Sequence, residues 1–560
     1  MVNSMPIKKW VATAASVGLL LSLGAGCSEE GASAISVDLY GWINDGSEAG
    51  RFVDDLLEFE GAEEVHISVT KPGERSVLER EIVPINDRSA RFPELDGGDG
   101  LRMDFELHDN LGPIAAGSTP EFNFEEGGQY RGFRAMIAGV DDFAPVGALF
   151  RGGDADRFDQ TTFDSRELDV QWSGRVGHTA HATDSGAIMV VGGAQLSGDY
   201  EPFHMPELTE ALNDIQLFDP DTGYFTELAG DREAIDAGVV GQDRLDRGRA
   251  FHTVTPLGDD RFLVVGGFAL TQEVTRPQSS IELIDLNAAP GQRVQPLEIN
   301  GAAVTLEESR GMHTATLRPG DGQVVIAGGL GTDSDDVIGS VEVIDPDGGQ
   351  SGMMMMNSPR VGHAAVVLDD RETVWLIGGR ADGSALSSTE QVHFIGGSLS
   401  VEGGPELHQP RYGASVLYLG SGNNNQVAIV GGFTSGGATA SYEIGNPRMS
   451  DSLHTRQLEE ARGQADFFRL PQSGDLLLVG GFDPDRNILR SAQRFEIDLD
   501  SLDTLAPVEH TVGSMHQIRG GPATSHVSNG RIVFIGGVDD DGVERNDAEY
   551  FTPYDPVGAF

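Results

Sequence analysis

The residues best suited to chemistry in this chain are arginine, histidine and glutamate side chains that recur at fixed places. Seven arginines open successive segments: Arg175, Arg249, Arg310, Arg360, Arg411, Arg462 and Arg519. The first four begin an Arg-x-x-His motif, which gives His178, His252, His313 and His363. A glutamate or glutamine follows each arginine at an equivalent place: Gln216, Glu282, Glu342, Glu390, Glu443, Gln493 and Glu549. A ring of such arginines could bind a ligand, and the histidines could hold a metal ion.

Their regular recurrence favours a structural role instead. A catalytic site needs one unique set of residues, whereas these arginine, histidine and Glu/Gln positions recur along the chain. We call each set of equivalent positions a column. We therefore interpret them as buried pairs in which the planar guanidinium satisfies a carboxylate and the backbone together. His66 and His108, which stand apart from the repeat, are predicted to be isolated surface residues. The sequence thus predicts no catalytic residue, no metal ligand and no cofactor.

A pair of glycines at the end of a hydrophobic run marks each repeat. The pairs begin at Gly192, Gly266, Gly328, Gly378, Gly431, Gly480 and Gly536. Runs such as Ile188-Met-Val-Val191 are typical of strands buried on both faces, and the glycines permit positive φ where the strand ends. Further strands precede and follow each run. Four antiparallel strands in each of seven repeats predict the blades of a propeller.

The paired glycines in register with the two polar columns resemble the kelch family. The resemblance covers residues 166–560 and implies a seven-bladed kelch-type β-propeller, like the central domain of galactose oxidases. The tryptophan usual in a kelch repeat is missing from every full repeat, and Trp172 is the one candidate. The last repeat ends soon after its third strand. We therefore predict that residues 167–172 supply the outer strand that closes the seventh blade.

Recognition residues are expected where the repeats differ, because binding loops are carried on a rigid scaffold. The first repeat has a long insertion that contains Asp199, Tyr200, Phe203 and His204. Two further long connections contain Arg232 and Arg276. Strand alternation predicts that these loops share one rim and form a recognition surface. The alternative is that they are tolerated insertions without a function.

The first 27 residues resemble a bacterial lipoprotein signal peptide. Lys8 and Lys9 precede an apolar run that ends at Cys27, the single cysteine of the chain. The resemblance implies a cysteine that is lipidated and anchors the protein, and Ser28 beside it implies the outer membrane. Gly24 departs from the motif, which prefers a larger aliphatic residue there. The alternative is an ordinary secretory signal with an incidental cysteine.

The remaining segments predict a tether at 28–34, a small β domain at 35–149 and a linker at 150–165. Alternating apolar residues in 35–149 suggest an immunoglobulin-like β-sandwich, so the whole chain is predicted to be all-β. The net charge of −50 argues against a nucleic-acid partner, which needs clustered cations.

We therefore predict a membrane-anchored binding scaffold with a protein or glycan ligand. The alternative is a propeller enzyme acting on sugars, as sialic-acid epimerases do. The copper cofactor of galactose oxidases is excluded, because its Cys–Tyr cross-link needs a cysteine in the folded body.

Overall fold

The computed structural model describes most of the chain between Gly18 and Pro553. The residues outside the description are 1–17, 24–32, 44–50, 54–58, 60, 72–73, 87–88, 93–97, 111, 119–121, 125–128, 146–172, 221–223, 231–237, 240, 396–397, 421–424, 450–451, 472, 498–504, 509–511, 528–529 and 554–560. The described residues are almost entirely β-strands and turns, as predicted. None of them belongs to a helix long and apolar enough to cross a membrane.

The chain divides into two compact units, 1–140 with 554–560 and 141–553. Among the residues that the structure describes, the first unit contains ten strands. They are β1 (Gly18–Leu23), β2 (Ser33–Ile43), β3 (Arg51–Val53), β4 (Glu64–Lys71), β5 (Glu74–Pro84), β6 (Ser89–Phe92), β7 (Gly98–His108), β8 (Pro113–Ser118), β9 (Phe122–Phe124) and β10 (Gln129–Gly139). Strand β1 lies within the predicted signal peptide and pairs with β2. Cys27 lies outside the described residues.

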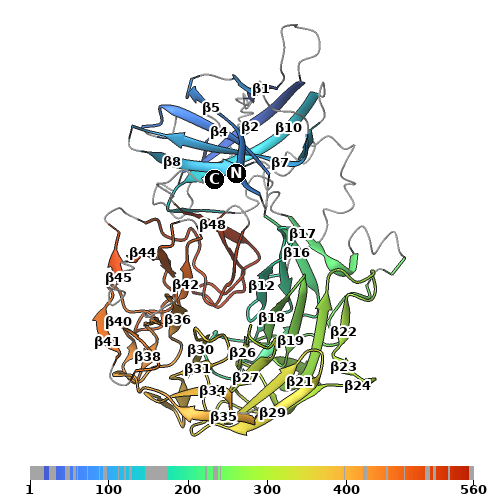
Figure 1. Ribbon diagram of the computed structural model, residues 1–560, viewed down its shortest axis with the longest axis vertical. Coiled ribbons are helices and arrows are strands. Elements are labelled where there is room, and N and C mark those ends of the chain that lie inside the picture. Colours follow the sequence, from blue (N-terminus) through green and yellow to red (C-terminus); the bar gives the residue numbers. More distant parts are fainter. Residues whose placement is uncertain are drawn as a thin grey trace, which may run out of the picture. The chain divides into compact units, whose positions relative to one another are not determined.

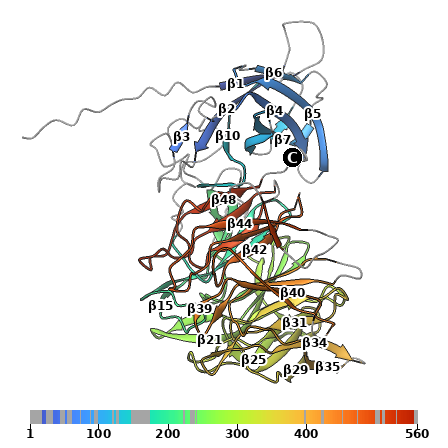
Figure 2. The same ribbon diagram turned by 90° about the vertical axis from the view of Figure 1, so that its left-hand side faces the viewer.

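The strands of the first unit form one sheet rather than the two sheets expected of an immunoglobulin-like sandwich. Its main path runs β5-β4-β7-β8-β10-β2-β1-β6, while β3 pairs with β2 and β9 with β7. The long strand β2 joins the two halves, because it pairs in parallel with β10 and antiparallel with β1. Figure 2 shows the curved strands of this sheet. On one face of β4 and β7, Ile67, Val69, Met103 and Phe105 are fully buried.

Among the described residues, the second unit contains six antiparallel sheets of four strands and one of six, and we call these seven sheets blades 1 to 7 (Figure 1). Two short strands extend the sheet of blade 2 beyond the four given for it here. Blade 1 contains β12 (Thr179–Ala182), β13 (Ile188–Val191), β16 (Ile215–Asp219) and β17 (Tyr224–Glu227); blade 2 contains β18 (Thr253–Gly258), β19 (Arg261–Val265), β21 (Val274–Asp285) and β22 (Val294–Pro296). Blade 3 contains β26 (Thr314–Leu317), β27 (Val324–Ala327), β28 (Ser340–Asp345) and β29 (Gly349–Met355); blade 4 contains β30 (Ala364–Val367), β31 (Val374–Ile377), β34 (Thr389–Ile395) and β35 (Ser398–Gly403). Blade 5 contains β36 (Ser415–Tyr418), β37 (Val427–Val430), β40 (Ser441–Gly445) and β41 (His454–Gln457); blade 6 contains β42 (Asp466–Arg469), β43 (Leu476–Val479), β44 (Ala492–Ile497) and β45 (Leu505–Pro507). Blade 7 contains β46 (Ala523–His526), β47 (Ile532–Ile535), β48 (Ala548–Thr552) and β11 (Asp142–Pro145).

Short elements connect these strands. They are β14 (Ala194–Leu196), β15 (Leu208–Ala211), β20 (Phe268–Thr271), β23 (Glu298–Ile299), β24 (Ala302–Ala303), β25 (Thr305–Arg310), β32 (Arg380–Ala381), β33 (Ser384–Ala385), β38 (Phe433–Thr434), β39 (Gly437–Ala438) and a 3₁₀ turn at Leu228–Gly230.

The blades follow one another around a ring. First strands of successive blades contact each other from β12 through β18, β26, β30 and β36 to β42, and β46 contacts β12. Blades 6 and 7 share a hydrophobic cluster that includes Leu477, Val479, Ile532 and Phe534. The second strand of each blade is buried along its apolar run, so it forms the core on both sides. This arrangement is a β-propeller.

The ring is closed by a different strand from the one predicted. Residues 167–172 lie outside the described residues, and β11 occupies the outer edge of blade 7 by pairing with β48. Phe143 of β11 is fully buried and packs at 5.1 Å, between ring centres, against Phe551. The second unit therefore begins at 141, earlier than the predicted boundary at 166. Strand β11 takes the outer position of blade 7 because its buried Phe143 side chain completes the core of that blade.

Candidate functional site

The seven arginines of the repeat occupy equivalent, buried positions in the ring. Each donates from Nη1 to the carbonyl oxygen of the first glycine in its own blade, at 2.7 to 3.1 Å. At six of the seven junctions the second glycine donates to the carbonyl of the next blade's arginine, as Gly193 does to Arg249 at 2.9 Å. At the closure, Gly537 donates to Arg175 at 3.1 Å. The arginines therefore fasten successive blades together.

A carboxylate neutralises each of these guanidinium groups. The column glutamates pair with the arginines of their own blades in five cases: Arg249–Glu282, Arg310–Glu342, Arg360–Glu390, Arg411–Glu443 and Arg519–Glu549. Blades 1 and 6 have a glutamine in the column. There Asp214 pairs with Arg175 at 2.9 Å, and Glu460 pairs with Arg462 at 2.6 Å.

The column glutamates also accept backbone hydrogen bonds from the loop before the arginine. Glu390 accepts from the N–H groups of Asn357 and Ser358, and Glu549 accepts from His516 and Gln517. Glu342, Glu390, Glu443 and Glu549 are almost fully buried. The columns thus use their polar atoms inside the fold, which leaves them little capacity for an external ligand.

The column histidines lie between blades. Nε2 of His178 is 3.1 Å from the carbonyl oxygen of Ile535 in blade 7. Nε2 of His313 lies 2.9 Å from Oγ1 of Thr253, and Nε2 of His363 lies 2.9 Å from Oγ1 of Thr314. Burial, with a contribution from the neighbouring arginine, lowers the pKa of His178, His313 and His363 to about 3. These histidines are therefore neutral at physiological pH.

The residue two places after each arginine forms a second ring. All seven have positive φ: Gly177, Phe251, Met312, Gly362, Gly413, Gln464 and Gly521. The N–H of Phe251 donates to Gly177, and that of Gln464 donates to Gly413. Four of these positions are glycine, so the ring has room for side chains from elsewhere.

The insertion of blade 1 fills that room. Residues 197–207, which we call the plug, connect β14 to β15. Phe203 packs onto the second ring, and a Cβ atom at Gly413 would lie 2.6 Å from the Phe203 ring. Phe203 also makes an edge contact with Tyr412, with 6.0 Å between ring centres. Tyr200 stacks on Phe251 at 6.1 Å.

Polar contacts also hold the plug in place. Nη2 of Arg380 donates to the carbonyl of Phe203 at 2.7 Å, and Nη1 lies 3.2 Å from Nε2 of His204. Nε2 of Gln464 donates to the Tyr200 hydroxyl at 2.7 Å. Burial raises the pKa of Tyr200 to about 12.

The plug touches all of the other six blades. The contacts described above reach blades 2, 4, 5 and 6. The backbone N–H of Met205 donates to Ser334 of blade 3 at 2.9 Å, and Tyr200 lies against Gly521 of blade 7. The insertion therefore crosses the centre of the ring at the rim that carries the arginines. Its anchored side chains face the propeller, while Asp199 and Glu207 are exposed.

The plug has a small concavity of its own. A cavity of about 140 Å³ is lined by Leu196, Gly198, Asp199, Tyr200, Glu201, His204, Met205, Pro206 and Glu207. Three carboxylates and one imidazole give it an acidic, polar lining. None of these residues belongs to the repeating columns.

The predicted recognition residues do not all meet. Asp199, Tyr200, Phe203 and His204 belong to the plug, but Tyr200 and Phe203 serve as inward anchors. Arg276 is exposed on β21 and is not among the residues that line the acidic cavity. Arg232 lies outside the described residues.

The structure adds residues that sequence reasoning missed. Arg380 and Gln464 hold the plug, and both are departures from the repeat that could have been noticed in the sequence. Asp466 is another departure, because Thr253 and Thr314 stand at the same place in blades 2 and 3. Burial raises the pKa of Asp466 to about 7, and Thr524 lies 3.5 Å away.

One prediction in the first unit is wrong. His66 and His108, predicted to be isolated, lie face to face with 3.6 Å between ring centres. The antiparallel register of β4 and β7 brings them together, because it aligns Glu64 with His108 and His66 with Glu106. The sequence separation of the two strands concealed this pairing.

No protein-family model matches the chain, and no curated protein is similar to it in sequence. Solved structures do resemble its fold. YjhT is 13% identical over 59% of this chain and 97% of its own, with a TM-score of 0.37. A fungal alcohol oxidase of the AA5 family, in complex with copper, is 14% identical over 69% of this chain and 75% of its own, with a TM-score of 0.46. Neither likeness indicates an activity for this chain.

Proposed function

We propose that this protein is a binding scaffold whose propeller presents the plug to a hydroxyl-rich ligand, most simply a neutral carbohydrate. The observation that carries the proposal is the placement of the plug. It crosses the arginine rim of the ring, is held by six blades, and presents a cavity lined by residues that do not repeat. Carboxylates accept hydrogen bonds from hydroxyl groups. The net charge of −50 disfavours acidic ligands.

An array of neutral glycans tests this proposal. The purified chain is expected to retain a subset of these glycans. A double variant, Asp199→Asn with Glu207→Gln, is expected to lose at least about tenfold in affinity, because charge-assisted hydrogen bonds become neutral ones. Both substitutions leave the anchors Tyr200 and Phe203 in place.

Glu298→Gln is the matched control, because Glu298 is an exposed carboxylate on β23, outside the plug. It should bind like the original protein. If no neutral glycan is retained, or if the double variant binds as the original does, the proposed ligand class is wrong.

The proposal includes export and attachment to the outer membrane through lipidated Cys27. Several acyl chains would hold the protein stably on a bilayer, since each buried methylene contributes about 0.8 kcal/mol. A Cys27→Ser variant expressed in a Gram-negative bacterium should move from the membrane fraction to the soluble fraction. Mass spectrometry of the original protein should find acyl groups on the cysteine. Equal membrane attachment of the variant would contradict the anchor.

Asp466 favours a second candidate, an enzyme acting on sugars inside the ring. A carboxyl group with a pKa of about 7 suits general acid–base catalysis. The plug, however, crosses the rim above it, which supports binding over turnover. Incubation of the retained glycans with the original protein and with Asp466→Asn separates the two. Product formed by the original and not by the variant would favour the enzyme.

A further inference from the structure

Histidine and glutamate side chains lie together on the polar face of β4 and β7 in the first unit. Alternation along the strands puts Glu64 and His66 on the same face as Glu106 and His108. The register pairs each histidine with a glutamate on the other strand. The result is a square of two imidazoles and two carboxylates on rigid strands rather than on loops.

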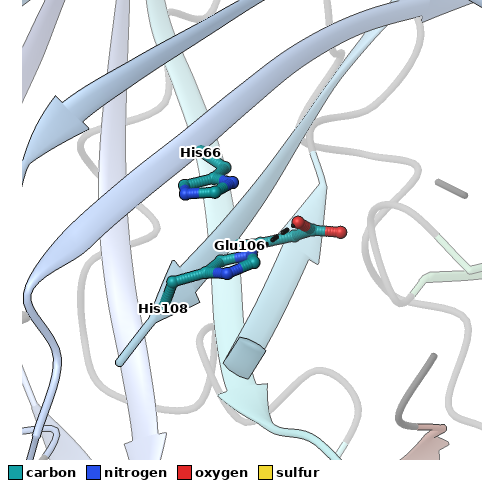
Figure 3. A group of neighbouring side chains, drawn as sticks. All are labelled: His66, Glu106 and His108. Carbon is teal, nitrogen blue, oxygen red and sulfur yellow. Dashed lines mark hydrogen bonds and ion pairs between the residues drawn. The ribbon is translucent and has the colours of Figure 1, made fainter. Parts of the chain in front are cut away.

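Three of these four side chains place their potential ligand atoms close together. Among the residues that the structure describes, His66, Glu106 and His108 form the one group whose ligand atoms all lie within 4.8 Å (Figure 3). Nε2 of His108 is 2.8 Å from Oε2 of Glu106. The side chains of His66, His108 and Glu106 are 13%, 16% and 8% exposed. They are therefore largely shielded from water but reachable by an ion.

A cationic group already occupies the position between these atoms. Nη2 of Arg80 lies 2.9 Å from Nδ1 of His66 and 3.2 Å from Oε2 of Glu106. A guanidinium nitrogen can only donate, so Nδ1 of His66 must be the unprotonated nitrogen. Its lone pair and the Glu106 oxygen thus converge on a positive charge. The Arg80 side chain is 38% exposed and can swing into solvent.

The other nitrogen of His66 has the partner that metal-binding histidines commonly have. Nε2 of His66 is 3.3 Å from Oε2 of Glu64. A carboxylate that accepts the second N–H fixes the tautomer and orients the ring. Glu64 is 55% exposed at its side chain, so it supports His66 from the rim of the site.

We propose that His66, Glu106 and His108 bind a divalent first-row transition ion, with Glu64 as the orienting carboxylate and Arg80 as a competing cation. Two imidazoles and one carboxylate are a donor set for Zn²⁺, and three protein ligands leave a position open for water. The two stacked rings must tilt toward a common ion, and Arg80 must leave. The proposal therefore predicts that the arginine weakens binding.

Zn²⁺ alone, titrated calorimetrically into the full chain, tests the site. Excess Mg²⁺ in the buffer occupies the many exposed carboxylates, because Mg²⁺ prefers oxygen ligands. It does not compete for a site with imidazole ligands, which suit Zn²⁺. One equivalent of Zn²⁺ is expected to bind. His66→Gln and His108→Gln should each weaken binding by at least about 100-fold, since loss of an orienting partner alone costs about 10- to 100-fold. Glu64→Ala should fall in that smaller range.

Two further variants make the test specific. Arg80→Ala should strengthen Zn²⁺ binding by at least about tenfold, because it removes a charge from beside the ion. A merely structural cluster would instead lose stability without gaining affinity. His393→Gln is the matched control, since Nε2 of His393 lies 3.8 Å from Oε1 of Glu402 and, among the residues that the structure describes, His393 belongs to no group of three potential ligands. This variant should bind Zn²⁺ as the original does.

Co²⁺ provides a second measurement that is independent of folding differences between variants. Absorption bands of a four-coordinate Co²⁺ ion are expected for the original protein, and excess Zn²⁺ should remove them. The proposal is overturned if the original protein shows no saturable equivalent of Zn²⁺. It is also overturned if His66→Gln and His108→Gln both bind as the original does.

Discussion

The buried neutral histidines should make the propeller sensitive to acid, and His313→Gln measures this effect. Burial lowers the pKa of His313 from 6.5 to about 3. Between pH 6.5 and about 3, His313 is therefore protonated in the unfolded chain and neutral in the folded chain. The stability contributed by this group is complete above pH 6.5 and is lost as the pH falls toward 3.

The magnitude follows from the two pKa values. One pKa unit corresponds to about 1.4 kcal/mol, so the 1.5 units between 6.5 and pH 5 give about 2 kcal/mol for His313. His178 and His363 have the same shift and would bring the total to about 6 kcal/mol. That is a large part of the 5–15 kcal/mol typical of folded domains.

Denaturant unfolding at pH 8 and pH 5 is the assay. Glutamine cannot be protonated and can still hydrogen-bond to the Thr253 hydroxyl. The variant is expected to be less stable than the original at pH 8 and to recover about 2 kcal/mol relative to it at pH 5. The exposed His454 on β41 gives the matched control, and His454→Gln should show no such change. If the free energy of unfolding differs between the original and His313→Gln by the same amount at both pH values, the conclusion that His313 is buried in its neutral form is wrong.

Three further predictions concern the plug, the ring interior and the closing strand. Phe203→Ala removes the ring that packs on Gly413; it should cost about 3 kcal/mol and make residues 197–207 susceptible to limited proteolysis. Burial raises the pKa of Asp466 from 3.8 to about 7, so the folded protein loses stability as the pH rises from about 4 to 7. The shift of about 3 pKa units predicts that Asp466→Asn is more stable than the original by about 4 kcal/mol at pH 8, measured by thermal unfolding, and equally stable near pH 4. Phe143→Ala should destabilise the second unit by about 3 to 5 kcal/mol in denaturant unfolding.

The repeat could be predicted from sequence because its signals are local. Each glycine pair follows an apolar run, and the positive φ of both glycines is a property of the backbone at that point. The closing strand could not be predicted in the same way. Asp142–Pro145 is short and has no alternating pattern, and the aromatic contacts of Phe143 with Phe534 and Phe551 join residues far apart in the chain. Trp172 carried the more familiar signal and was misleading.

The plug illustrates a similar limit. Its position in the sequence was evident, because the insertion of the first repeat is long and contains residues that do not recur. The direction of its aromatic residues depends on Gly362, Gly413 and Gly521, which lie in three other blades. The pairing of His66 with His108 depends on the register of two strands in the same way. Local patterns indicate which residues are unusual, but they do not show which of them meet.

The two glutamine positions of the repeat strengthen the structural interpretation of its polar columns. In blades 1 and 6, where Gln216 and Gln493 replace the glutamate, a carboxylate comes from elsewhere, Asp214 in one case and Glu460 in the other. A buried guanidinium without a counterion is costly, so each blade must supply one negative charge but need not supply it from one place. A ligand-binding ring would have no reason to restore neutrality blade by blade. The recurring charges are therefore paired within the scaffold, which supports the proposal that recognition depends on residues that occur once.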